Sequence, residues 1–346
     1  MSTPLAPEYR RCPVTNRWVV IAPERAARPI TLSHAAPHSR DANGRADCPF
    51  CEGSEHETPG ERFAIRADGT APNGPGWQLR VVPNKFPAVR SHLALGFASE
   101  PSALFESRPA IGRHELVIPC SRHLSNPVDL TDGEFRDKLL AYRDRIQLHS
   151  ANPQTAYVTI FQNVGAEAGA SLAHLHSQIV TMPMVPDGVR HELDQSAAYF
   201  ERVKKCVFCD ILREELPLRH RVVTETPHFV VLTPFAARFA YEMWVLPKAH
   251  VSHFETINAE IALELAVVFK DILGRLDAVL HKPAYNFFLH TGPVRSGALV
   301  HYHWHFEIIP RTARAAGFEW GSGCFINTTS PEQAALELRR GSPKMA

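Results

Sequence analysis

The chain has 346 residues, 45% of them hydrophobic and 21% charged, which are the proportions of a soluble globular protein long enough for two domains. Its 37 Lys and Arg nearly balance its 36 Asp and Glu, so no broad electrostatic field favours nucleic acid or an anionic membrane. No apolar run approaches the about 20 residues that span a bilayer, and the first residues contain no stretch typical of a secretory signal. We therefore expect a cytoplasmic protein that binds neither nucleic acid nor membrane.

The first half of the chain predicts strands around one long helix. Strands are expected at Leu79–Val82 and at Tyr157–Phe161, which is rich in aromatic and β-branched residues. Between them, residues 131–134 form a capping box, which predicts a helix from there to about Leu148. After Phe161, a turn containing glycine leads to a further strand that carries histidines.

The second half repeats this order. A strand is expected at Phe229–Leu232, and Asn258 is expected to cap a helix whose apolar residues recur at helical spacing. A strand at Tyr285–Leu289 and a histidine-rich run at His301–His305 follow. Each half thus predicts an α+β unit with a mostly antiparallel sheet and one long helix.

The two halves are related by a nearly constant offset. The Cys-x-x-Cys pair at residues 48–51 recurs at residues 206–209. An offset of 127 residues then relates His123 to His250, His174 to His301, Glu115 to Glu242, His176 to His303 and Pro183 to Pro310. We expect two copies of one fold, at residues 1–195 and 196–346, joined near residues 190–203.

The strongest local signal for chemistry lies in residues 163–178. Alternate residues of a strand face one side, so His174, His176 and Gln178 are expected on one face. The glycine-rich turn before them lets backbone N–H groups approach phosphate oxygens. This combination favours capture of a phosphoryl group by histidine over the alternative, polar residues satisfied within a sheet. Gln178 can donate to a phosphoryl oxygen but cannot shuttle protons at neutral pH, which favours transfer over hydrolysis.

The duplicated cysteine pairs predict two zinc sites. A structural Zn²⁺ takes four nitrogen or sulfur ligands, whereas the alternative for a single pair is a redox motif or two unrelated thiols. If His174 holds metal, His176 is left free to attack the α-phosphorus of a sugar nucleotide and form a phosphoramidate, with the metal acting by positioning. The expected ligands are Cys48, Cys51, His123 and His174 in the first copy and Cys206, Cys209, His250 and His301 in the second.

Four segments carry a resemblance to a known family, namely Trp18–Pro29, Asn163–Gln178, Ala316–Asn327 and Pro331–Ala335. On these, the chain resembles the galactose-1-phosphate uridylyltransferase branch of the histidine-triad superfamily over almost its whole length. The resemblance implies two tandem histidine-triad-like units and a ping-pong exchange in galactose metabolism, in which UDP-glucose gives UMP to His176 and galactose 1-phosphate collects it. It also implies zinc as cofactor, a sugar nucleotide and a sugar phosphate as partners, and a homodimer, since arginines of the N-terminal segment can act across subunits.

The same resemblance implies the roles of individual residues. The nucleophile of the family is the second histidine of the active-site segment, which is His176 here. The residues expected to contact the nucleotide or its phosphates are Arg25, Arg28, Asn84, Asn163, Gly169, Ser171 and Gln178.

Departures from the family pattern leave alternatives open for the substrates and the second metal. The spacer residues Leu175 and Ser177 resemble those of the related ADP-glucose phosphorylase type. That type uses the same covalent chemistry with another base and acceptor. Arg311 and Arg314 stand where better-studied enzymes place a lysine to grip the hexose phosphate. Some members hold their second metal with a glutamate and three histidines, a set that could here be Glu192, His290, His303 and His305.

The second copy leaves the class of activity open as well. In the run His301–His305, His303 could be a nucleophile and His305 an acid, which suits a nucleotide hydrolase. The preceding turn contains Pro293, which removes an N–H donor, so a structural role is favoured for this copy. A non-catalytic zinc-binding module is the third class, but it gives no reason to combine a glycine-rich turn with His176 and Gln178.

Overall fold

The computed structural model describes residues 6–27, 48–91 and 104–341. Ten strands form one sheet in the order β3-β4-β5-β7-β6-β11-β12-β10-β9-β8, and all neighbouring strands in it run antiparallel. The bounds in the first half are β3 Phe63–Arg66, β4 Trp77–Pro83, β5 His114–Ile118, β6 Tyr157–Val164 and β7 Ser177–Met182. Those in the second half are β8 Val222–Glu225, β9 Phe229–Leu232, β10 Met243–Pro247, β11 Tyr285–His290 and β12 His305–Pro310.

The two halves of this sheet have the same strand order. Each contributes five strands, β3-β4-β5-β7-β6 and β8-β9-β10-β12-β11, and the halves meet where β6 pairs with β11. The prediction of an α+β fold with antiparallel sheets is confirmed. The copies share one continuous sheet, and residues 195 and 196 lie inside helix α2 (Asp187–Val203).

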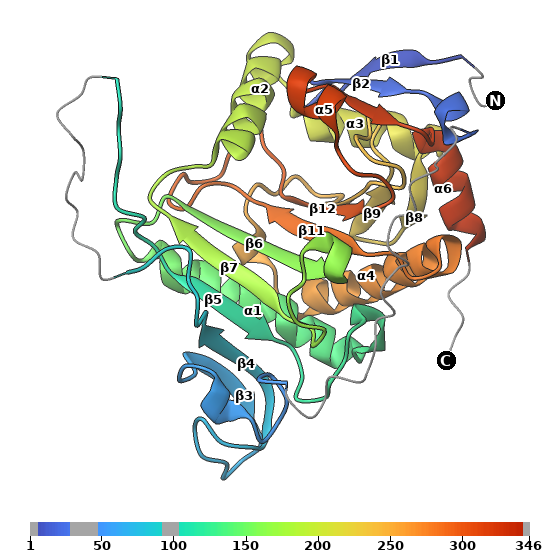
Figure 1. The fold of residues 1–346 in the computed structure, drawn as a ribbon. Helices are drawn as coiled ribbons and strands as arrows, with labels where there is room; N and C mark the ends of the chain where they lie inside the picture. Colours follow the sequence, from blue (N-terminus) through green and yellow to red (C-terminus); the bar gives the residue numbers. More distant parts are fainter. Residues whose placement is uncertain (1–5, 28–47, 92–103, 342–346) are drawn as a thin grey trace.

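One long helix of each copy packs on the same face of the sheet (Figure 1). Helix α1 (Asp132–Ser150) begins with the predicted capping box: the Thr131 hydroxyl accepts from the Glu134 amide at 3.1 Å, and the Glu134 carboxylate accepts from the Thr131 amide at 2.8 Å. Helix α4 (Ala259–Leu280) begins at Asn258, whose side-chain oxygen accepts from the Ile261 amide at 2.8 Å. Apolar residues of both helices and of strands from both copies form one buried cluster.

The other face is covered mainly over the second copy. There α2, α3 (Val207–Leu218) and a small sheet close over the strands (Figure 1). The small sheet joins the two ends of the chain, because β1 (Glu8–Arg11) and β2 (Trp18–Ile21) pair with each other and β2 pairs in parallel with β13 (Phe325–Asn327). The C-terminal helices are α5 (Gly317–Ser322) and α6 (Pro331–Arg340). Among the described helices, none combines the length and the apolar character that crossing a membrane requires.

His174 and His176 do not lie on the strand where they were expected. Strand β7 begins at Ser177, so His174 and His176 lie in the segment just before it. The physical reason is that the Leu175 amide donates to Leu124 O at 2.8 Å instead of to a neighbouring strand. The prediction that His174 and His176 belong to a strand is therefore wrong.

Candidate active site and metal centres

The first cysteine pair meets two histidines from distant parts of the chain. The ligand atoms of Cys48, Cys51, His123 and His174 all lie within 4.8 Å of one another. Cys51 Sγ is 3.2 Å from His123 Nδ1 and 3.6 Å from His174 Nδ1, and Cys48 Sγ is 3.5 Å from His174 Nδ1. The structure thus brings together all four residues that the sequence predicts for the first metal site.

The chemistry of this group fits a zinc ion. Two thiols and two imidazoles form the donor set of a structural Zn²⁺. The Nε2 of His174 lies 3.1 Å from Cys120 O, a hydrogen bond that places the proton on Nε2 and leaves Nδ1 directed at the thiols. Burial lowers the pKa of His174 to about 4, so the ring is neutral at physiological pH, as a metal ligand must be.

The second cysteine pair meets a different histidine from the one predicted. The ligand atoms of Cys206, Cys209, His250 and His303 lie within 4.8 Å of one another. The Nε2 atoms of His250 and His303 donate to backbone carbonyls at 3.1 and 2.8 Å, which again leaves Nδ1 facing the thiols. The His301 ring is not part of this group; the backbone oxygen of His301 lies 3.7 Å from Cys206 Sγ. The expectation of His301 as a ligand is wrong, and His303 takes its place.

The error comes from the register of the duplication. His303 Nε2 contacts the carbonyl of Pro247 as His174 Nε2 contacts that of Cys120, and His305 Nδ1 contacts His303 O as His176 Nδ1 contacts His174 O. The structure therefore equates His174 with His303, an offset of 129 and not 127 residues. Because three alternating histidines offer two registers, the sequence pattern could not distinguish them.

His176 is placed as a base with one free nitrogen. Its Nδ1 lies 2.9 Å from His174 O, so this nitrogen carries the proton and Nε2 keeps its lone pair. The side chain is 7% exposed, and the ring packs edge-on against Phe50 at a centroid distance of 5.1 Å. Burial lowers the pKa of His176, and the positive charge of Lys138 lowers it further, so the neutral form prevails at pH 7.

A cavity of about 580 Å³ opens in front of this ring. Ser171, Gln178 and Asn84, all predicted to contact substrate, line it with His176. Gln178 Oε1 is 2.8 Å from His114 Nε2, which is 3.1 Å from the Asn84 side-chain nitrogen. His114 was not predicted from the sequence, although it begins strand β5, which pairs with the strand that carries Gln178.

Gly169 and Asn163, which were also predicted to contact the substrate, shape the turn before His176. Gly169 has a φ of 85° and Gly165 a φ of 83°, values that favour glycine, and residues 166–168 form one 3-10 turn between them. Asn163 does not line the cavity of His176; its side-chain nitrogen lies 3.4 Å from Gly169 O. Asn163 is thus placed to stabilise the turn of its own chain by this hydrogen bond.

Of the two predicted arginines, Arg25 is not among the residues that line this cavity. Arg25 lies on a 3-10 helix at Pro23–Ala27, which follows β2 in the small sheet over the second copy. Arg28 lies outside the described residues. Among the described residues that line the cavity of His176, Lys85 is the sole Lys or Arg.

Comparison with known proteins places the chain in a family. Residues 3–186 match the family described as galactose-1-phosphate uridyl transferase, N-terminal domain, and residues 130–339 match a domain of unknown function, DUF4921. The chain belongs to the galactose-1-phosphate uridylyltransferase family. Its relatives in this family are nucleotidyltransferases and phosphorylases, and the chain is a nucleotidyltransferase.

Two relatives of this uridylyltransferase family cover nearly the whole chain. ADP-glucose phosphorylase of Arabidopsis thaliana is 35% identical over 97% of this chain and 93% of that protein. Galactose-1-phosphate uridylyltransferase of Thermotoga maritima is 28% identical over 96% and 98%. The crystal structure of the Arabidopsis thaliana ADP-glucose phosphorylase with bound ADP-glucose has a TM-score of 0.82, covering 97% of this chain and 100% of that one. The similarity thus extends from sequence to fold in both copies.

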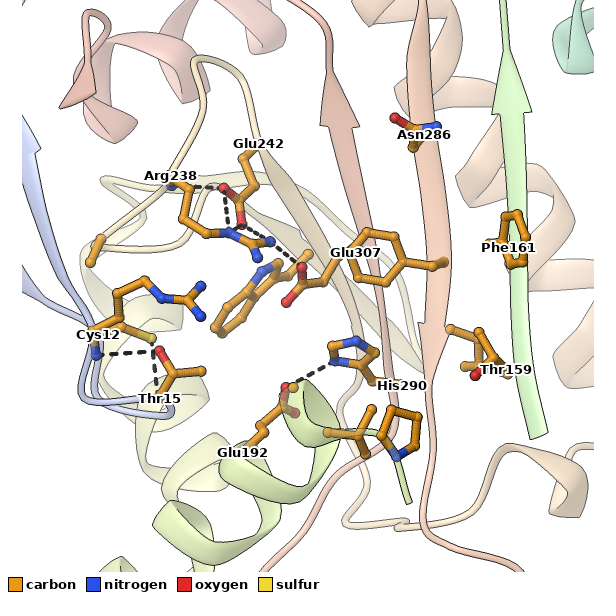
Figure 2. Close-up of a pocket in the computed structure, with 18 of the residues that line it drawn as sticks. Cys12, Thr15, Thr159, Phe161, Glu192, Arg238, Glu242, Asn286, His290 and Glu307 are labelled. Carbon is orange, nitrogen blue, oxygen red and sulfur yellow. Dashed lines mark hydrogen bonds and ion pairs between the residues drawn. The ribbon is translucent and has the colours of Figure 1, made fainter. Parts of the chain in front are cut away.

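A second cavity of this uridylyltransferase-family chain, of about 450 Å³, is lined by residues of both copies (Figure 2). Glu192 and His290 form an ion pair there at 2.9 Å, and Arg238 pairs with Glu242 at 3.0 Å and with Glu307. Burial alone would raise the pKa of Glu307, but the charge of Arg238 holds it well below its usual range. Two carboxylates, Glu242 and Glu307, therefore share the Arg238 guanidinium, and a third, Glu192, pairs with His290.

These residues revise the alternative set of ligands for a second metal. Glu192, His290, His305 and Glu307 have ligand atoms within 4.8 Å of one another. His303, expected in this set, belongs to the cysteine group instead, and Glu307 stands in its place. The set does not fit a resident cation well, because the Arg238 guanidinium already pairs with Glu307 and would repel a metal beside it.

The geometry also argues against a second catalytic histidine. His303 is fully buried and has one ring nitrogen on Pro247 O and the other facing Cys209 Sγ at 3.9 Å, so the expectation that it could be a nucleophile is wrong. His305, the counterpart of His176, is also fully buried, with Nε2 3.6 Å from Glu192 and 3.8 Å from Glu307. Carboxylates in these positions would repel a phosphate.

Proposed function

We propose that the chain transfers a nucleoside monophosphate from a sugar nucleotide to a second phosphate through a covalent adduct on His176. The observation that carries this proposal is the hydrogen bond from His176 Nδ1 to His174 O, because it leaves Nε2 unprotonated in front of the cavity. The lowered pKa of His176 supports the neutral, nucleophilic form.

The reaction has two displacement steps at one phosphorus. In the first, the Nε2 lone pair attacks the α-phosphorus, the P–N bond forms, and the bond to the bridging oxygen breaks, which releases the sugar 1-phosphate. In the second, an oxygen of the acceptor phosphate attacks the same phosphorus, the P–N bond breaks, and His176 returns to its neutral form. No proton has to leave Nδ1 in either step, which is consistent with its bond to a carbonyl.

The roles of the residues around the His176 ring follow from the hydrogen-bond donors that they offer. The Gln178 side chain accepts from His114 through Oε1, so its amide N–H₂ is left to donate to an oxygen of the transferred phosphoryl group. An amide cannot deprotonate water, so the adduct persists until an acceptor arrives. Asn84, Lys85 and the 84%-exposed ring of Phe86 line the same cavity and are suited to hold a nucleoside.

ADP-glucose is the donor that we favour, with inorganic phosphate as acceptor. In support, the relative of higher identity is an ADP-glucose phosphorylase, and its structure with ADP-glucose covers almost all of this chain. From the sequence alone, UDP-glucose was the expected donor. Uridylyl transfer to galactose 1-phosphate is kept as the second candidate, because the N-terminal half matches the uridylyltransferase domain.

Zinc at the two cysteine–histidine groups supplies positioning in this proposal. His174 belongs to the first group, and its carbonyl is the acceptor that fixes the tautomer of His176. Holding His174 therefore holds the nucleophile. The second group, with Cys206, Cys209 and His303, joins the corresponding parts of the second copy and has no such link to His176.

We further propose that the protein is a homodimer in which Arg25 and Arg28 of one subunit reach the phosphates at His176 of the other. The two phosphates of a donor need more positive charge than Lys85 supplies, while Arg25 lies over the other half of its own chain. Mixing Arg25→Ala and His176→Ala variants, each inactive alone, would restore part of the activity after subunit exchange. No restoration would contradict the sharing of arginines.

The decisive experiment uses donors labelled at the α-phosphate. The protein is incubated with ADP-glucose and with UDP-glucose, separately and without acceptor, and label on the protein is measured before and after acid. We expect acid-labile label from ADP-glucose, lost on addition of phosphate as ADP. Faster labelling from UDP-glucose would select the second candidate, and absence of label from both would refute the covalent mechanism.

A further inference from the structure

The turn before His176 is held by side chains outside it, Asn163 of the first copy and Asn286 of the second. Its own bonds join Gly165 O to the amides of Ala168 and Ala170, at 3.1 and 3.2 Å. The carbonyls of Ala168 and Gly169 accept hydrogen bonds from side-chain amides instead. The orientation of the turn therefore depends on residues that do not belong to it.

Asn286 on β11 is the centre of this arrangement. Its Nδ2 donates to Asn163 Oδ1 at 2.7 Å and to Ala168 O at 2.8 Å, and Asn163 Nδ2 then donates to Gly169 O. Asn286 lies directly opposite Asn163 in the pairing of β6 with β11. Because Asn286 is only 8% exposed, water competes little for these bonds.

Arg311 fixes which way the amide of Asn286 points. Its Nε donates to Asn286 Oδ1 at 2.6 Å, a charge-assisted bond that reserves the oxygen and turns the N–H₂ toward Asn163 and the turn. Ala284 adds a steric limit, because a Cβ built at Gly165 would lie 2.9 Å from its Cβ. Ala284, Asn286 and Arg311 all belong to the second copy.

The next residues of the chain face the reaction. Ser171 and Leu172 line the cavity of His176, and their backbone amides donate to no residue in the described part of the chain. The carbonyls that Asn286 and Asn163 hold, those of Ala168 and Gly169, belong to peptide groups only a few residues before these amides.

We propose that Asn286, oriented by Arg311, is a positioning residue that aims the Ser171 and Leu172 amides at the phosphoryl group attacked by His176. The proposal rests on the proposed function and gives the second copy a task in catalysis, although its own histidines are enclosed. It concerns the chemical step more than binding, because donors placed for the transition state lower its free energy most.

The test compares single-turnover labelling rates of full-length variants with the donor that labels the wild-type chain. Asn286→Ala removes both donor bonds, and Asn286→Asp keeps the pairing with Arg311 while removing the N–H₂. We expect both to slow labelling by roughly 10- to 100-fold, the scale of a small misplacement of reacting groups, with half-saturation by donor changed by less than about twofold. Arg311→Lys keeps a cationic donor and should restore most of the rate that Arg311→Ala loses.

Asn327 provides the matched control. It is also buried, and its Nδ2 donates to two backbone carbonyls, of Ala237 and Phe239, in the small sheet away from His176. Asn327→Ala should lower the thermal midpoint without slowing labelling of the folded protein. Wild-type labelling rates in Asn286→Ala and Asn286→Asp would overturn the positioning role alone, as would equal slowing by Asn327→Ala. An unlabelled wild-type chain would overturn the transferase and this proposal with it.

Discussion

The two copies differ most at the counterparts of one histidine. His176 and His305 make the same hydrogen bond from Nδ1 to the carbonyl two residues earlier. In front of His176 lie a cavity and the neutral amide of Gln178, whereas His305 faces Glu192 and Glu307. The comparison teaches that the backbone geometry of a histidine does not make it a nucleophile. A histidine with this geometry can act as a nucleophile only where its surroundings are neutral and open enough to admit a phosphate.

The largest expected effect is on transfer when the two histidines are exchanged for alanine. His176→Ala should fold and lose transfer by roughly three or more orders of magnitude, as removal of a nucleophile does in other covalent enzymes. His305→Ala should leave labelling within about tenfold of wild type once loss of folded protein is corrected. Labelling of His176→Ala would contradict the contrast between the two histidines. A folded His305→Ala variant that takes up no label would contradict it as well.

Removing one cysteine from each metal group should separate positioning from folding. Cys48→Ser and Cys206→Ser should each weaken zinc retention by more than about 100-fold, the upper range for changes to groups that merely support a ligand, and lower the thermal midpoint. Only Cys48→Ser should also slow labelling, because His174 belongs to its group. Metal analysis and labelling on the same samples test this, and unchanged zinc in either variant would refute that site.

Gln178→Glu makes the first copy resemble the second, where Glu307 occupies this position. A carboxylate there repels the phosphate and can act as a base toward water. We expect transfer to fall by about 100- to 1,000-fold, the cost of losing one aligned donor, and a larger share of the adduct to be lost as free nucleoside monophosphate. Both follow from labelled donor with and without acceptor, and an unchanged share would contradict the role of the amide.

The smallest expected effect concerns acid stability in the first copy. Burial would raise the pKa of Glu115, but hydrogen bonds from His149 and Arg145, the latter at 2.6 and 2.8 Å, lower it below its value in the unfolded chain. A lowered folded pKa means that this stability is complete above the unfolded pKa, about 4.3, and is lost as pH falls through the folded pKa.

Glu115→Gln should therefore lower the free energy of unfolding at pH 7 by about 3 to 5 kcal/mol, since it leaves Arg145 and His149 buried without their charged partner. The variant should lose less further stability than wild type between pH 5 and pH 3. Urea unfolding at several pH values measures both, and parallel pH profiles of the two proteins would contradict the assignment.

The sequence by itself predicted features that depend on neighbours along the chain. The capping box predicted α1, the cap residue Asn258 and the helical spacing predicted α4, and the repeated cysteine pairs predicted the twofold construction. The glycine-rich run marked the segment that contains His176. Each of these follows from local spacing, because helix caps, turns and the reach of a Cys-x-x-Cys pair are set within a few residues.

Only the tertiary structure decided which residues meet across the sheet. A run of three alternating histidines admits two registers, so His303 could be distinguished from His301 only by its contact with Cys209 and Pro247. The bonds of His114 to Gln178 and of Asn286 to Asn163 join strands far apart in sequence. The physical reason is that cross-strand partners are selected by how whole strands pair, which no short sequence pattern specifies.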